Sequence, residues 1–204
     1  MEVQDRIRQK ADELFRRYGI RSVTMDEIAT QLGMSKKTIY QYYADKDQLV
    51  DAVAMDEIHY SQECCTKDAE VSSNAIEEIF RVMEFVEVMF RSMNPSMLHD
   101  LERYHPTGYR KFLDHKNKFL YEMIRKNIER GIKEELYRPE IDVEIMARYR
   151  IEGMMLLFNP ELFPSSKFNL VKLHQEILEH FLYGLATLKG YKLILKYKQQ
   201  RLNK

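Results

Sequence analysis

Tryptophan is absent from this 204-residue chain, and glycine and proline are scarce, with 7 and 5 residues. Because these two residue types most often interrupt helices, their scarcity leaves long stretches that can be helical. Leucine, isoleucine, methionine, glutamate and lysine also recur at helical spacing, which favours helices over strands. With 45% hydrophobic residues the chain can bury a core in one large or two small domains. We therefore expect an all-α globular protein.

Long apolar runs are also missing. No stretch approaches the roughly 18 uncharged apolar residues of a membrane span, and the amino terminus lacks the apolar core of a secretory signal. We therefore expect a cytoplasmic protein with no membrane partner. The two cysteines, Cys64 and Cys65, are adjacent, and neighbouring residues reach normal disulfide geometry only with strain. We interpret both as helix side chains, with a redox or metal role as the alternative.

The sequence also lacks the motifs of common enzyme sites. It contains no glycine-rich phosphate loop, nucleophile elbow or Cys-x-x-Cys pair. His99-Asp100 is a pair of the kind that metal-dependent phosphohydrolases use, but no further His and Asp partners stand at helical offsets from it. His174 and His180 are six residues apart, so they do not share a helix face closely enough to bind one metal. We therefore expect no catalysis, no metal site and no cofactor.

Net charge gives no sign of a nucleic-acid partner, because 32 basic residues balance 32 acidic ones. The distribution is uneven, however. Residues 1–47 carry 9 basic and 8 acidic side chains (+1), residues 48–188 carry 17 and 24 (−7), and residues 189–204 carry 6 and 0 (+6). The acidic excess therefore lies in the middle of the chain.

Hydrophobic periodicity predicts helices along most of the chain. The expected ranges are 3–18, Met25–Leu32, Lys36–Tyr43, 46–64, 75–92, 96–104, 107–135, 141–158 and a last helix from about 168 into the basic tail. Three capping signals lie within the first fifty residues, each with a polar side chain placed to accept a backbone N–H of the first turn. They are Thr24 with Glu27, Ser35, and Asp45 with Gln48. Two very short helices joined by a turn at Gly33 have the spacing of a helix-turn-helix.

The second of these short helices has an exposed face suited to DNA. Ile39 and Tyr43 are four residues apart and can face inward together, which leaves the polar side chains outside. Lysine can donate to guanine and glutamine can pair with adenine, whereas hydroxyl groups suit phosphate oxygens. Lys46 lies at the start of the following helix, where phosphate is also favoured. The alternative is that the lysines form only a solvated face and the tyrosines only the margin of a core.

Together these residues resemble the amino-terminal signature of the tetracycline-repressor (TetR/AcrR) family. The matching segments are Thr24 to Ala29, Leu32 to Tyr43, and Asp45 to Leu49, preceded by Leu14-Phe15 and Gly19. The resemblance implies a homodimer of all-helical subunits, each with a three-helix DNA-binding domain at 1–47 and an effector-binding and dimerisation domain at 48–204. Two positions depart from the family: Lys37 is often glycine, and Tyr43 is more usually phenylalanine.

The resemblance also implies a role for individual residues on double-stranded operator DNA. Positions that touch the phosphate backbone correspond to Thr24, Ser35, Thr38, Tyr40, Tyr42 and Lys46. Positions from which bases can be read correspond to Met25, Lys36, Lys37 and Gln41. Subunits of this family pair through helices that correspond here to 141–158 and 168–190. A dimer would place two recognition helices in successive major grooves of a palindromic operator.

A ligand site is expected in the second domain. Eight of the twelve methionines fall between Met83 and Met155, alongside several aromatic residues, and a bundle lined in this way could accept a small apolar or aromatic effector. The residues expected to line it are Met83, Phe90, Met93, Met97, Tyr104, Phe119, Met123, Tyr149 and Met154. The alternative is that these side chains are ordinary core.

Three functions remain open at this level. The first is a repressor released from its operator by the effector, and the second is a ligand-independent DNA-binding protein of the same fold. The third is a helical enzyme or adaptor without DNA contact. The cationic tail 189–198 either meets an acidic surface or DNA, or is a helix end whose lysines complement the helix dipole.

Overall fold

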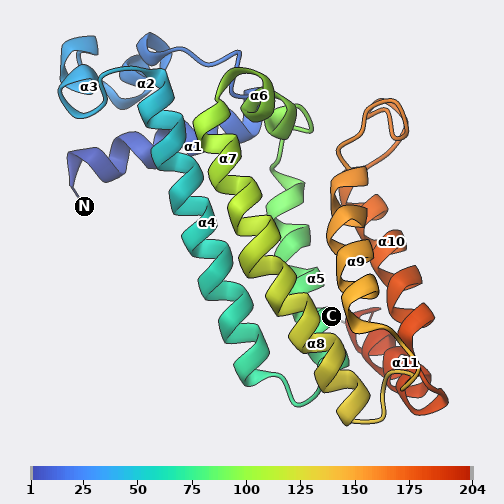
Figure 1. Ribbon diagram of the computed structural model, residues 1–204. Helices are drawn as coiled ribbons and strands as arrows, with labels where there is room; N and C mark the ends of the chain where they lie inside the picture. Colours follow the sequence, from blue (N-terminus) through green and yellow to red (C-terminus); the bar gives the residue numbers. More distant parts are fainter. Residues whose placement is uncertain (1, 203–204) are drawn as a thin grey trace. The chain divides into compact units, whose positions relative to one another are not determined.

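The computed structural model describes residues 2–202, and within that range it contains helices and no strand, apart from an isolated bridge between Tyr137 and Ala186 (Figure 1). The helices are α1 (Val3–Tyr18), α2 (Met25–Leu32), α3 (Lys36–Tyr42), α4 (Lys46–Val71), α5 (Ala75–Arg91), α6 (Met97–Tyr104), α7 (Pro106–Asp114), α8 (Tyr121–Lys133), α9 (Val143–Leu156), α10 (Leu170–Leu185) and α11 (Leu188–Leu202). The all-α prediction is confirmed.

The helices pack into two compact units. Unit 1 comprises the chain up to Ser61 together with Ser92–His115, and unit 2 comprises Gln62–Arg91 together with the chain from Lys116 onward. Helix α4 therefore begins in unit 1 and ends in unit 2. The expected domain boundary at residue 47 stays a prediction. The compact unit 1 extends further, since it also includes the first part of α4 together with α6 and α7.

Unit 1 has its own hydrophobic core, to which each of the first four helices contributes. Its fully buried side chains include Ile7, Phe15, Ile28, Ile39 and Leu49. Each contributes roughly 1.5–3 kcal/mol relative to an exposed side chain. The short helices α2 and α3 would not be stable alone, so this shared core is what holds them.

The α6–α7 segment is joined to the amino-terminal helices of unit 1 by polar contacts. The buried carboxylate of Asp100 accepts the backbone N–H of Arg21 at 3.0 Å, and His105 Nδ1 lies 2.6 Å from a carboxylate oxygen of Asp47. Asp100 thus has a structural role, whereas its neighbour His99 is exposed. No group of three or more metal-ligating side chains occurs among residues 2–202.

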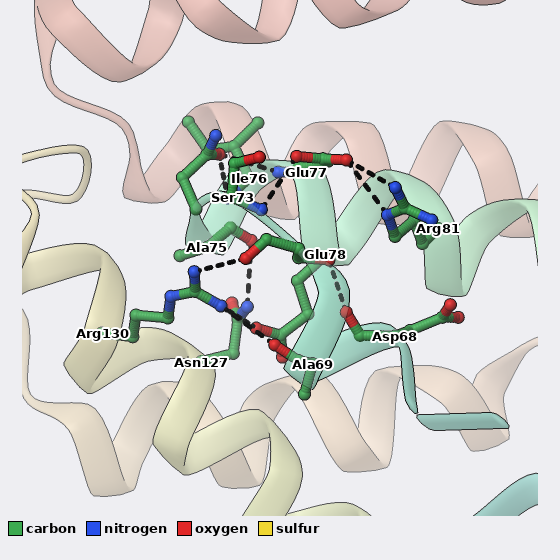
Figure 2. Close-up of polar contacts among 12 residues, drawn as sticks. Asp68, Ala69, Ser73, Ala75, Ile76, Glu77, Glu78, Arg81, Asn127 and Arg130 are labelled. Carbon is green, nitrogen blue, oxygen red and sulfur yellow. Dashed lines mark hydrogen bonds and ion pairs between the residues drawn. The ribbon is translucent and has the colours of Figure 1, made fainter. Parts of the chain in front are cut away.

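In unit 2, Arg130 ties the end of α8 to the α4–α5 connection (Figure 2). Its guanidinium donates to the carbonyl oxygens of Ser72 at 2.7 Å and Ala69 at 3.3 Å. The same group pairs with Glu78 at 3.3 Å and with Glu134 at 2.7 Å. With four acceptors this cation is well compensated, so it rigidifies the turn instead of weakening it.

Two predicted helices differ in the structure. The expected helix over 107–135 is helical from Pro106 to Lys133, but His115–Leu120 is a π-helical segment within it. The expected helix 46–64 continues to Val71.

The predicted single helix from about 168 into the tail is wrong, because the chain breaks between α10 and α11. Ala186 is extended, with φ −70° and ψ 141°. The Thr187 N–H donates to the Leu136 carbonyl at 2.9 Å, and the Arg138 N–H donates to the Leu185 carbonyl at 2.9 Å. These bonds to a distant loop replace the helical ones. The cationic tail is therefore α11, whose Ile194 is buried in the core of unit 2.

Among residues 2–202, no helix combines the length and the apolar character that crossing a bilayer requires.

The contact between Gly131 and Tyr137 leaves no room for a side chain at position 131. A Cβ there would lie 2.0 Å from Cδ2 of the Tyr137 ring, which is fully buried. We expect Gly131→Ala to lower the free energy of unfolding by about 1–3 kcal/mol, measured by urea denaturation. In a Tyr137→Ala background the same change should cost much less, because the ring is gone. Equal costs in both backgrounds would contradict the steric explanation.

Candidate nucleic-acid interface

Helix α2 ends in a tight turn at Gly33. This residue is left-handed, with φ 64° and ψ 29°, a conformation that favours glycine. The Gly33 N–H donates to the Thr30 carbonyl at 3.1 Å, and the Met34 N–H donates to the Ala29 carbonyl at 2.9 Å. This is a Schellman motif, which ends α2 abruptly and redirects the chain into α3.

Hydroxyl side chains cap both helices of this pair, as expected. Thr24 Oγ1 accepts the Glu27 N–H at 3.1 Å, and Ser35 Oγ accepts the Thr38 N–H at 3.1 Å. The Ser35 and Thr38 hydroxyl groups also lie 2.8 Å apart. The caps fix where α2 and α3 begin. The hydroxyl groups of Ser35 and Thr38 are thereby held at the amino end of α3, where an anion is favoured.

The outward face of α3 is polar and contains no acidic residue. Ile39 is fully buried and Tyr43, just after the helix, is nearly so. The outward side chains are Lys36, Lys37, Tyr40, Gln41 and Tyr42, all of them exposed. A helix of this kind presents the donors and acceptors that a major groove requires.

Lys36 is held by two neighbouring side chains. Its ammonium lies 2.6 Å from a carboxylate oxygen of Asp26 and 5.9 Å from the centre of the Tyr40 ring. Both partners of this ion pair are more than half exposed, so the pair contributes little to stability. Lys36 can therefore exchange Asp26 for a base edge at low cost.

Two residues expected to contact DNA are occupied within unit 1. Met25 is only 6% exposed and belongs to the core, so its side chain has little surface to offer a base. The Lys46 ammonium donates to the Ile20 carbonyl at 2.6 Å, and burial lowers the pKa of this lysine. Any contact of either residue with DNA would require these arrangements to change.

The side chains expected to line a ligand site are divided between the two units. Met93, Met97 and Tyr104 belong to unit 1, and the other six belong to unit 2. Met97 packs against the core of unit 1, and Tyr104 is exposed, with the guanidinium of Arg21 5.3 Å from the centre of its ring. In unit 2, Met83 and Phe90 are buried, whereas Tyr149 is 57% exposed.

Sequence reasoning missed two polar residues in the core of unit 2. Arg150 is 6% exposed and His174 is 1% exposed. The signal was present, because Arg150 follows Ala147 by three residues and Val143 by seven, which puts it on the apolar stripe of its helix. A charge at such a position is unusual in a core.

Comparison with known proteins assigns the amino-terminal region to a family. Residues 7–53 match the family model for bacterial regulatory proteins of the tetR family. An uncharacterized helix-turn-helix transcriptional regulator of Bacillus subtilis (strain 168), YvaF, is 34% identical over 85 residues, which are 41% of this chain and 45% of that protein. The match therefore spans less than half of that relative's length.

Two further proteins resemble the chain over most of its length. The transcriptional repressor KstR2 of Mycolicibacterium smegmatis is 23% identical over 154 residues, which are 71% of this chain and 72% of that repressor. A crystal structure of a protein named as a transcriptional regulator, from Saccharomonospora viridis in complex with choline, has a TM-score of 0.74 at 17% identity. It covers 90% of this chain and 97% of that protein, and at this identity it shows a shared fold.

His174 makes the stability of the protein sensitive to acid. Burial, together with the charges of Arg150 and Arg201, lowers the pKa of His174 from 6.5 to about 3. Between pH 6.5 and about 3 the unfolded chain binds a proton at this histidine that the folded chain does not bind. The contribution of neutral His174 to the free energy of unfolding is therefore complete above pH 6.5 and is lost as the pH drops toward 3. We expect His174→Leu to reduce this loss by about 1 kcal/mol per pH unit between pH 6 and 4, measured by urea unfolding. The exposed His180 on the same helix is the control, and His180→Leu should keep the original slope.

Proposed function

We propose that the chain is a regulator of the TetR/AcrR family, whose family model its residues 7–53 match, and that it acts as a cytoplasmic repressor that binds a palindromic operator as a homodimer. Its second unit takes a small-molecule effector that releases the operator. The observation that carries the proposal is the face of α3, which combines exposed lysine, glutamine and tyrosine side chains with no acid. Such a face suits base edges and phosphates together.

Dimerisation is supported by the apolar surface of α9. Ile145 and Tyr149 are 59% and 57% exposed, and Leu156 is 47% exposed. They stand at positions i, i+4 and i+11, so they share one face of the helix. Exposed apolar stripes of this kind mark protein interfaces, and a second copy of the chain would cover this one through α9 and α10. A dimer is also what a short recognition helix needs to read a full operator.

An effector can release the operator only if it binds the released conformation of the protein more tightly than the DNA-binding conformation. An effector shifts the equilibrium only by its differential affinity for the DNA-binding and the released states. Helix α4 is the natural carrier of such a change, because Leu49 and Val53 anchor its first half in unit 1 and its second half belongs to unit 2. The structural relative crystallised with choline is consistent with a fold that accommodates small molecules.

The direct test is selection of bound sequences from a random duplex library at near-physiological salt. Enrichment of a two-fold-symmetric site would support a dimeric repressor and supply the operator for effector screening. If the folded protein enriches no site, the proposal of sequence-specific regulation is refuted.

Gln41 and Tyr42 are adjacent residues with different proposed roles. Gln41 is proposed to read a base, and Tyr42 is proposed to contact a phosphate. We expect Gln41→Ala to lose about 1–3 kcal/mol of discrimination at one base pair in each half-site, with affinity for random DNA unchanged. Tyr42→Phe should weaken specific and random DNA by the same factor, because a phosphate contact carries no sequence information. Competition binding at fixed salt measures both effects.

The matched control is Gln200→Ala, which removes an exposed glutamine from α11 and should change neither quantity. Equal losses on specific and random DNA for Gln41→Ala would contradict its assignment as a base-reading residue.

The proposed interface can be tested by introducing a charge on α9. We expect Ile145→Glu to convert the dimer into a folded monomer and to abolish operator binding at nanomolar protein concentrations, because a carboxylate would be buried without a partner. Sedimentation velocity measures the oligomeric state. Leu195→Glu, at an apolar residue of α11 that is 45% exposed, is the control and should remain dimeric. If the Ile145→Glu variant remains dimeric, the dimer interface does not include this face of α9.

A further inference from the structure

Unit 2 contains two buried polar side chains that lack partners. Neither ring nitrogen of His174 on α10 has a hydrogen-bond partner. Arg150 on α9 has no carboxylate within ion-pairing distance among residues 2–202, and its guanidinium lies 5.8 Å from the centre of the Phe181 ring. Phe181 and His174 are seven residues apart on α10, so the ring that Arg150 contacts and the His174 ring lie on the same face of that helix. The charge of Arg150 also lowers the pKa of His174.

Arg150 keeps its charge despite its burial. Burial lowers its pKa to about 10, which leaves the guanidinium protonated at neutral pH. No charged group opposes this shift, since burial is its single cause. An uncompensated buried charge is strongly unfavourable, and proteins normally pair it or expose it. A core position that holds an unpaired guanidinium is therefore suited to an anion that comes from outside the chain.

The charges around His174 do not cancel. Arg201 is ion-paired with Glu87, and the Gln175 side-chain amide donates to the same Glu87 carboxylate at 2.8 Å. Two guanidinium groups and one carboxylate leave a net charge of +1. One added carboxylate would neutralise this cluster, whereas a cation or a second positive group would be repelled.

The surroundings of the cluster are aromatic. The Phe90 ring meets the His174 ring edge to face, with centroids 5.5 Å apart, and meets the Phe158 ring in the same way at 5.6 Å. The Phe181 ring lies against the Arg150 guanidinium. An inorganic anion would leave this apolar surface unused, whereas a ligand with an apolar body would bury itself against it.

We propose that Arg150 and His174 bind the carboxylate of a ligand with an apolar body, such as a medium-chain fatty acid or an aryl-alkanoic acid. The Arg150 guanidinium donates two N–H groups to the carboxylate, and the neutral His174 ring donates one. This assignment rests on the proposed function, because it names the chemical class of the effector.

The test uses the full chain without DNA and follows its thermal unfolding. The probes are octanoate, decanoate and 3-phenylpropanoate, all kept below their critical micelle concentrations. The matched neutral probes are octanol, decanol and 3-phenylpropanol, and acetate represents an anion without an apolar body. We expect the Tm to rise with concentration for at least one of the three carboxylates, and to rise much less for the matching alcohol and for acetate.

Two arginine variants on one helix sharpen the test. Arg150→Met keeps the side-chain length but removes the charge, and it should weaken carboxylate binding at least about tenfold. Without ligand it should raise the Tm by about 2–4 °C, because an unpaired buried charge has been removed. Arg148→Met is the control, because Arg148 is exposed and pairs with Glu144, and it should bind carboxylates as the native protein does.

Three outcomes would overturn the proposal. The first is that no carboxylate in the series stabilises the native protein more than its alcohol, and the second is that Arg150→Met binds carboxylates as tightly as the native protein does. The third is a fall of several degrees in the ligand-free Tm of Arg150→Met, which would show that ordered water or a second subunit already satisfies this arginine.

Because none of these measurements involves DNA, failure of the carboxylate site leaves operator selection unaffected. Conversely, if the protein binds carboxylates but selects no operator, the carboxylate site is supported and the proposed regulatory function is refuted.

Discussion

The surface proposed to bind DNA depends on the burial of one side chain, Ile39. Helix α3 has only seven residues, so it cannot hold itself in place and relies on Ile39 in the core of unit 1. Once Ile39 points inward, helical geometry turns Lys37 and Gln41 outward. The Gly33 turn and the Ser35 cap act on the same helix by setting where it starts. The outward face is thus a consequence of core packing.

This arrangement explains how a chain of zero net charge can carry a local surface suited to DNA. The acidic excess lies in residues 48–188, whereas α3 has two lysines and no acid. Lys36 is paired with Asp26 by an exposed and weak ion pair, so its charge is available to another partner. The charge close to a bound DNA groove matters more than the net charge of the chain, because salt screens exposed charges beyond about 10 Å.

Unit 2 contains two arginines in opposite situations. Arg130 has two carbonyl and two carboxylate acceptors around its guanidinium, and the turn between α4 and α5 is built on them (Figure 2). Arg150 is more deeply buried than Arg130 and has an aromatic ring and an unpartnered histidine beside it. The first arginine stabilises the fold through satisfied bonds. The second has no such bonds, and an unpaired buried charge of this kind is the basis for the proposed carboxylate site.

The start of α3 and the turn before it could be predicted from local sequence, because caps and glycine turns use hydrogen bonds between residues three to five apart. Ser35 with Thr38 and Gly33 with Thr30 are examples. The three-dimensional packing set the break at Ala186, where hydrogen bonds to the loop near Leu136 interrupt a helix that periodicity predicted. It also decided that Met25 is core and that Arg150 lacks a partner. These outcomes depend on side chains distant in the sequence, and local patterns do not contain that information.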